Sequence, residues 1–151
     1  MALTANKIIE KKAQPAIKKL KLVDGLIHIY KGGHVMYEAG NIGYVMTGAD
    51  TVSAEYAGIA LEEISKAAAD NTADGTFEVE VLQRGCGEEI LMDTTGTMTI
   101  ANEGDPVYLD TDDKVDTASG VVNTTGGLVG IIRQFVSANK AWVQMVPHPT
   151  L

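Results

Sequence analysis

A turn-rich stretch, Asn102-Glu-Gly-Asp-Pro-Val-Tyr-Leu-Asp-Thr-Asp-Asp113, gives the first indication of the fold class. A Gly-Asp turn comes before Pro106, which lacks an N–H donor and therefore begins a strand or lies at a sheet edge. Val107-Tyr-Leu109 then favours extended backbone before an acidic turn. Lys114-Val-Asp-Thr117 follows as a returning strand. The stretch therefore predicts a short β-hairpin.

Further short strands are predicted on both sides of this hairpin. Residues 127–132 and 141–146 form a second hairpin around a polar turn. Upstream strands are expected at residues 26–30, 34–37, 42–46, 57–61, 77–81, 89–92 and 97–100, with 62–69 either a short helical turn or a continuation. About ten short strands with turn signals roughly every ten residues predict an all-β fold, a small β-sandwich or barrel-like domain.

The core is expected to form from the two C-terminal hairpins together with Phe77, Val79 and Val81. Residues 77–81 alternate between apolar and polar side chains, which is typical of a strand with one face in the core. The second hairpin contains the only tryptophan, Trp142. We expect Trp142 to be buried, so that truncating it to alanine costs ~3–5 kcal/mol.

Charge is unevenly distributed along the chain. The whole chain carries a net charge of −8, whereas residues 1–31 hold seven lysines against Glu10 and Asp24, a net charge of +5 that leaves −13 for the rest. We therefore predict a basic N-terminal arm, residues 1–24, that is extended or mobile in isolation, and a β domain, residues 25–151.

Aliphatic residues lie between the lysines of this arm, which favours an arm that becomes ordered on a capsid or on a neighbouring subunit. A solvated, frayed terminus is the alternative. The residues expected to make the contact are Lys7, Ile8, Ile9, Lys11, Lys12, Ile17, Lys18, Lys19 and Leu20.

Composition disfavours several functional classes. The single cysteine, Cys86, cannot form an intrachain disulfide, which indicates a reducing compartment. No apolar run reaches the ~18 residues of a membrane span, and no secretory signal pattern is seen. The net charge of −8 disfavours general nucleic-acid binding. We therefore expect neither nucleic acid nor membrane as a partner.

No cluster of side chains predicts catalysis or metal binding. His28 and His34 are separated by two glycines and have no further ligands nearby in sequence. Cys86 has no histidine base nearby in sequence. The acidic turn at 110–113 lacks the glycine and the closing glutamate of a calcium loop. We therefore expect no catalytic residue, no metal ligand and no cofactor.

Several pieces of sequence follow one another in an informative order. They are Gly33-His-Val-Met-Tyr-Glu-Ala-Gly40, Tyr56-Ala-Gly-Ile-Ala60 with Glu62-Glu-Ile64, Gly104-Asp-Pro-Val-Tyr-Leu-Asp110, Leu128-Val-Gly-Ile-Ile132 and Ala141-Trp-Val-Gln-Met145. Over residues 32–146 the chain resembles a tailed-bacteriophage capsid decoration (cement) protein of the small β-domain type. The Gly-Asp-Pro-Val-Tyr turn and the Val129-Gly130 strand are the most telling pieces, whereas the basic arm and residues 75–87 lie outside the resemblance.

That resemblance implies a structural protein of the virion. Such a protein is made in the host cytoplasm and binds the outer surface of an assembled phage head. There it contacts the major capsid protein and reinforces the shell, often as a trimer, without catalytic residues. From the residues alone two alternatives stay open: a small-ligand-binding β barrel, and a hydrolase that uses Cys86 as its nucleophile.

Overall fold

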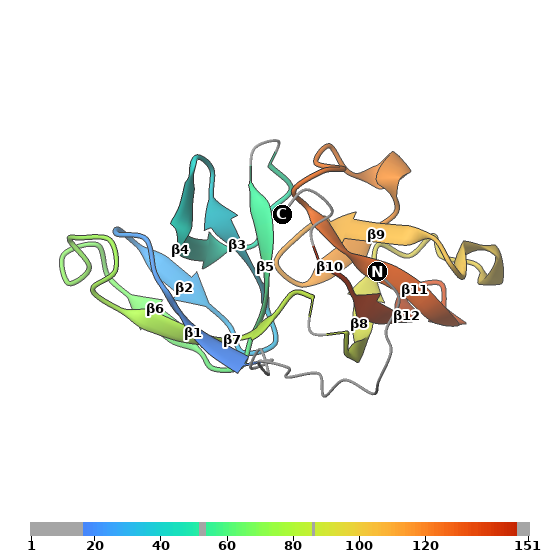
Figure 1. Cartoon of the computed structure of the whole chain (residues 1–151), viewed down its shortest axis with the longest axis horizontal. Helices are drawn as coiled ribbons and strands as arrows, with labels where there is room; N and C mark the ends of the chain where they lie inside the picture. The colour runs from blue at the N-terminus through green and yellow to red at the C-terminus, as the bar shows by residue number, and fades with distance from the viewer. Residues whose placement is uncertain (1–16, 52–53, 86, 148–151) are drawn as a thin grey trace, which may run out of the picture.

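A computed structural model of the chain describes residues 17–51, 54–85 and 87–147 (Figure 1). Strands dominate these residues, which confirms the predicted all-β fold class. The strands are β1 (Ile17–Lys21), β2 (Ile27–Ile29), β3 (His34–Glu38), β4 (Asn41–Thr47), β5 (Glu55–Ala60), β6 (Ile64–Lys66), β7 (Glu78–Gln83), β8 (Glu89–Thr94), β9 (Pro106–Leu109), β10 (Lys114–Asp116), β11 (Leu128–Ser137) and β12 (Lys140–Met145). Two short 3-10 helices accompany them, η1 (Ile100–Asn102) and η2 (Ala118–Gly120).

The strands are divided between two halves of the molecule. In the first half, residues 17–85, a five-stranded sheet has the order β1-β7-β5-β3-β4, and the two-stranded sheet β2-β6 packs on it. In the second half, residues 87–147, the strands β10-β8-β12-β11-β9 form a closed barrel. Both predicted hairpins, β9–β10 and β11–β12, lie in this barrel as antiparallel pairs. Figure 1 shows the two halves side by side, with β5 between them.

The central strand β5 is buried on both faces. Tyr56 and Ile59 belong to the core that fills the barrel, whereas Ala57 and Ala60 belong to the core of the first half. A strand covered on both sides needs apolar residues at successive positions rather than in alternation. This requirement explains the nearly unbroken apolar run of Tyr56-Ala-Gly-Ile-Ala60.

The structure has two cores where the sequence predicted one. The C-terminal hairpins supply Val107, Leu109, Val115, Val129, Ile132, Val143 and Met145 to the barrel core. Val79 and Val81 are fully buried, but in the core of the first half, and Phe77 packs at its margin. The predicted core residues other than Trp142 therefore point inward, but they do not form a single cluster.

Trp142 is not a core residue, and that prediction is wrong. Along β12 the side chains of Ala141, Val143 and Met145 face the barrel interior, so Trp142 faces outward and is 37% exposed. Side chains alternate between the two faces of a strand, and the three inward positions are filled by smaller residues. The expected loss of ~3–5 kcal/mol on truncation applies to buried aromatics and no longer applies to Trp142.

Residues 17–24 belong to the β fold rather than to an arm. Strand β1 pairs antiparallel with β7, and Leu20, Leu22 and Val23 are buried. Leu22 also forms a parallel bridge with Val45 of β4, which curls the five-stranded sheet toward closure. The predicted boundary after residue 24 is therefore wrong for residues 17–24, because their aliphatic side chains complete a core. Residues 1–16 lie outside the described residues.

One predicted strand, residues 97–100, is also wrong. The chain leaves the barrel after β8 and forms η1, in which the Thr99 N–H donates to the side-chain oxygen of Asn102 over 2.9 Å. Local side-chain capping of this kind competes with strand pairing. Within the ambiguous segment 62–69, residues Ile64–Lys66 form β6 and pair with β2.

Candidate interaction surface

The predicted contact residues of the arm fall into two groups. Ile17, Lys18, Lys19 and Leu20 all lie in β1. Leu20 points into the core and is only 7% exposed, whereas Ile17 is 49% exposed. Of this group, only Ile17 and the two lysines have exposed side chains. The other predicted residues, Lys7, Ile8, Ile9, Lys11 and Lys12, lie outside the described residues.

The lysines of β1 face acidic residues of the same chain. In the β1–β7 pairing Lys19 lies opposite Glu80, and Lys21 lies opposite Glu78. Opposite charges directly across a strand pair stabilise it by roughly 0.2–1 kcal/mol. Part of the basic charge of the predicted arm therefore lies opposite acidic residues of the same chain. The Lys-x-Lys and Glu-x-Glu patterns of the two strands carried this signal, but their register was not visible in the sequence.

The outer face of the barrel carries an exposed apolar pair. Trp142 of β12 lies directly opposite Leu91 of β8, and their exposed fractions are 37% and 44%. On the other side Trp142 lies opposite Gln134 of β11, which is also exposed. We call these three residues the Trp142 face. The sequence pattern does not predict this face, because the size of Trp142 favours a place in the core.

Polar pairs border the Trp142 face along the strands. At one end the Lys140 ammonium lies 3.2 Å from the Asp93 carboxylate. At the other end the Arg133 Nε donates to the Gln144 side-chain oxygen over 2.7 Å. An apolar centre with a polar rim is the usual composition of a specific protein interface. The Trp142 face has this composition, and its central strand, β12, is paired on both sides.

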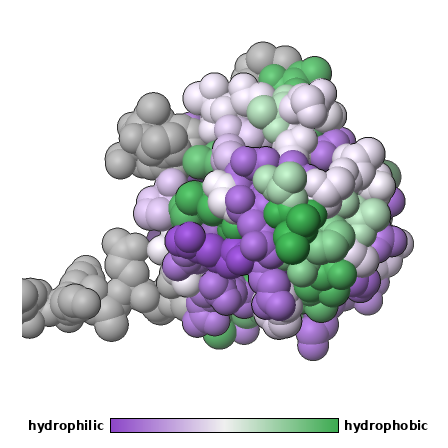
Figure 2. All heavy atoms as spheres, turned by 90° about the vertical axis from the view of Figure 1, so that its right-hand side faces the viewer, coloured by the Kyte–Doolittle hydropathy of each residue, from purple (hydrophilic) through white to green (hydrophobic). Residues whose placement is uncertain are grey.

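Other exposed apolar side chains lie elsewhere on the second half. Figure 2 views the molecule from the side formed by this half and shows apolar groups among hydrophilic residues. The exposed large apolar residues of this half are Leu91, Ile100, Val122, Val136 and Trp142. Scattered single residues of this kind are normal on protein surfaces, so we build the candidate site on the cross-strand pair.

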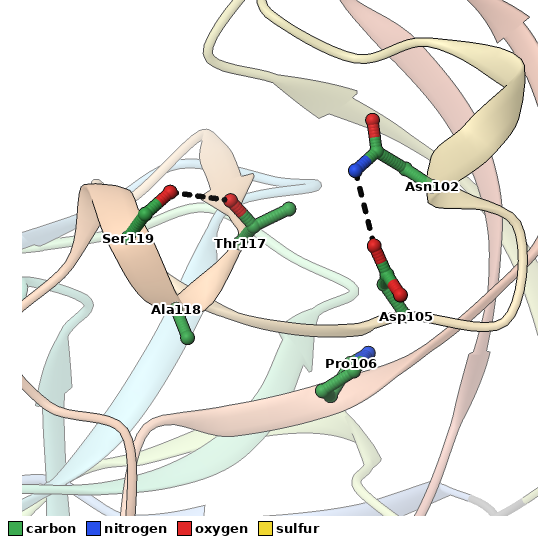
Figure 3. A pocket seen from close by; sticks show the side chains of 6 residues that line it. All are labelled: Asn102, Asp105, Pro106, Thr117, Ala118 and Ser119. Atoms are coloured by element: carbon green, nitrogen blue, oxygen red, sulfur yellow. Dashed lines mark hydrogen bonds between the residues drawn. The ribbon is translucent and has the colours of Figure 1, made fainter.

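A pocket of ≈ 310 Å³ lies between η1 and η2 (Figure 3). Its lining residues are Asn102, Asp105, Pro106, Thr117, Ala118 and Ser119. The Asn102 amide donates to the Asp105 carboxylate over 3.0 Å, and the hydroxyls of Thr117 and Ser119 share a hydrogen bond of 3.1 Å. The lining contains no nucleophile beside a general base, which covalent catalysis requires. A second pocket beside Asp93 and Lys114 is lined by threonine, glycine and asparagine.

The two histidines that the structure describes have separate structural partners. The His28 Nε2 lies 2.9 Å from the Glu63 carboxylate at the surface. His34 is buried, and its Nδ1 lies 2.9 Å from the Tyr56 hydroxyl. Residues 17–51, 54–85 and 87–147 contain no group of three His, Cys, Asp or Glu side chains placed to hold a metal ion. Cys86, the candidate nucleophile, lies outside the described residues.

The sequence matches no protein-family model and no curated protein. Within the described part of the chain, no helix has the length and apolar character needed to cross a membrane.

Proposed function

We propose that this chain is a structural capsid decoration protein that binds the outer surface of an assembled phage head through the major capsid protein. The observation that carries the proposal is the exposed Trp142–Leu91 pair on the closed barrel. The proposal also draws on the resemblance of residues 32–146 to small phage decoration proteins. Binding that adds contacts across an assembled shell stabilises it without any chemical step.

Trp142 has the properties of an anchor for protein binding. Tryptophan is enriched among the few interface residues that carry most of the binding energy. Its cross-strand neighbour Leu91 extends the apolar area, and the paired strands on both sides hold the two side chains in place. Little conformational freedom is then lost on binding, which favours affinity.

The barrel supports contact through its outer face rather than ligand binding in its interior. Its interior is filled by buried side chains, among them Val107, Val115, Val129 and Val143. A small barrel filled in this way is a packed core. Closure also leaves the barrel without a free edge for strand addition, so side chains of the outer face are the groups that it offers to a partner.

Replacing Trp142 by alanine tests this role. Because Trp142 is a partly exposed surface residue, we expect the free energy of unfolding to fall by less than ~1 kcal/mol. Binding to capsids should weaken by about 30-fold, which corresponds to an interface anchor worth ~2 kcal/mol. The measurements are chemical denaturation and co-sedimentation with purified capsids. The control is Leu26→Ala, because Leu26 is 78% exposed but lies in the first half.

Two results would contradict this role for Trp142. One is a Trp142→Ala variant that binds capsids as tightly as the wild type. The other is an equal loss of binding in Leu26→Ala, because the effect would then not depend on the Trp142 face.

We further propose a homo-oligomer, with a trimer favoured by the resemblance. Ile17–Lys21 of β1 pair with β7, and the bridge to β4 comes only after this strand, at Leu22, so the other edge of Ile17–Lys21 has no paired strand among the described residues. Sheet edges need protection, and closed symmetry between identical chains commonly supplies it. Light scattering should return about three times the 16.0 kDa chain mass. A monomer mass at working concentrations, with single copies on the capsid, would defeat this proposal.

A further inference from the structure

His34 occupies the junction between the two halves. It is the first residue of β3 and is only 3% exposed. Its backbone N–H donates to the carbonyl oxygen of Asp112, in the turn between β9 and β10 of the barrel, over 2.6 Å. Its own carbonyl oxygen accepts the N–H of Gly48 over 2.9 Å. His34 therefore ties β3 to the barrel and to the segment after β4.

The imidazole continues this connection through Tyr56. The Nδ1 of His34 and the hydroxyl of Tyr56 share a hydrogen bond of 2.9 Å, and Tyr56 is fully buried. The same hydroxyl lies 3.9 Å from the Met145 sulfur of β12, and the Tyr56 N–H donates to the Gly126 carbonyl oxygen over 2.8 Å. Two residues of the first half, His34 and Tyr56, are thus joined to three segments of the second.

The surroundings of the imidazole favour its neutral form. Burial lowers the pKa of His34 from 6.5 to about 4, and the negative charges of Asp113 and Asp93 oppose this shift without cancelling it. The titratable groups facing it are Tyr56 on β5, Asp93 on β8 and Asp113 in the turn between β9 and β10, whereas Asp112 of the same turn contacts His34 through its backbone carbonyl. The segment after β4 contributes Gly48, which has no titratable group.

We propose that His34 is a protonation-sensitive latch: when its imidazole takes up a proton, the junction opens while the strands within each half stay paired. A charged imidazolium is poorly solvated in this buried position beside Tyr56 and is attracted toward the carboxylates of Asp93 and Asp113. Movement in that direction breaks the hydrogen bond to Tyr56. It also strains the backbone bond between His34 and Asp112, which crosses the junction.

The sign of the pH dependence follows from the lowered pKa of His34. In the open junction the imidazole is solvated and titrates near 6.5, whereas in the closed junction it titrates near 4. Protons therefore bind the open form more tightly between these values. The closed junction is fully favoured above pH 6.5 and is progressively lost as the pH falls toward 4. The two pKa values imply that the opening equilibrium constant rises about 20-fold from pH 7 to pH 5.

Hydrogen exchange by NMR on the full chain tests the latch. The junction amides are those of His34 and Tyr56, whose hydrogen bonds cross between the halves. The reference amides are those of Ile132 and Val143, which lie in paired strands inside the barrel. From pH 7 to pH 5, after correction for intrinsic exchange rates, we expect about 20-fold more opening at the junction amides and little change at the reference amides.

Two variants separate the latch from general acid sensitivity. His34→Gln keeps a polar side chain that does not titrate, so its junction opening should be nearly independent of pH. His28→Gln removes the exposed histidine and should behave as the wild type. The inference is overturned if His34→Gln keeps the wild-type pH dependence, or if the junction and reference amides of the wild type lose protection together.

A measurement on the wild type covers the case in which His34→Gln does not fold. The ring resonances of His34 can be followed directly from pH 8 to pH 4. We expect its imidazole to stay neutral in the closed junction and to change charge only as the junction amides open. Titration near pH 6.5 with the junction amides still protected would refute the latch.

Discussion

Leu22→Ala is expected to lower the free energy of unfolding by about 2–5 kcal/mol, the range for truncating a fully buried leucine. Leu22 has no exposed surface and packs in the core of the first half. It also forms the bridge to Val45 through which the strand order β1-β7-β5-β3-β4 curls back on itself. A cavity at this position removes contacts at both terminal strands of the sheet, β1 and β4.

Ile17→Ala is the matched control, because Ile17 lies in β1 but is 49% exposed. Its truncation should change stability by at most ~0.5 kcal/mol, as is usual for surface positions. Urea denaturation of both variants gives the comparison. Equal, small effects at Leu22 and Ile17 would mean that residues 17–24 are an arm after all and that the core does not depend on them.

Gly58→Ala is expected to cost more than ~4 kcal/mol or to prevent folding, because an added methyl group has no space. A Cβ at Gly58 would lie 2.1 Å from the Leu82 carbonyl oxygen and 2.7 Å from a methyl carbon of Val81. The φ of Gly58 is +150°, which side chains other than hydrogen rarely allow. Strands β5 and β7 would have to separate at the centre of the molecule.

Gly96→Ala controls for the backbone conformation alone. Gly96 also has a positive φ, +94°, but a Cβ there would meet no atom within 4 Å. The cost should be about 1–2 kcal/mol, the usual penalty for a left-handed conformation without a clash. Thermal or urea unfolding distinguishes the two variants. A Gly58→Ala protein as stable as Gly96→Ala would show that the approach of β5 to β7 is looser than the structure has it.

The sequence predicted those parts of the fold that depend on local patterns. The alternation at Val79 and Val81 and the turn before Pro106 indicate strands within a few residues, and both strands form. The prediction of a strand at residues 97–100 is wrong because the Thr99 N–H donates to the Asn102 side-chain oxygen nearby in sequence. This hydrogen bond favours η1 over a strand. Strand propensity is weak against such local bonding.

The error at β1 concerns which strands pair with each other. The sequence predicts a free arm for the lysines of β1, because Glu78 and Glu80, which lie opposite Lys21 and Lys19, are far along the chain. Strand register is fixed by tertiary packing and is not visible in one strand alone. Trp142 shows a different error: its large apolar surface favours burial, whereas the alternation of Ala141, Val143 and Met145 already predicts that its side chain faces outward.

Strand pairing also brings together most of the candidate surface and the junction between the two halves, and a single strand of the sequence does not reveal that pairing. Leu91 and Trp142 become neighbours only through the pairing of β8 with β12. His34 and Tyr56 meet only because β3 and β5 are adjacent in the sheet. These contacts depend on topology, so a pattern search along the sequence does not find them.

Capsid binding is the central claim of the proposed function, and electron cryo-microscopy of virions tests it most directly. The particles to image are those assembled from the genome that encodes this chain. We expect density for the chain on the outer surface of the head, with the Trp142 face against the major capsid protein. Intact heads without this density, or with the chain located inside the head or in the tail, would contradict the proposal.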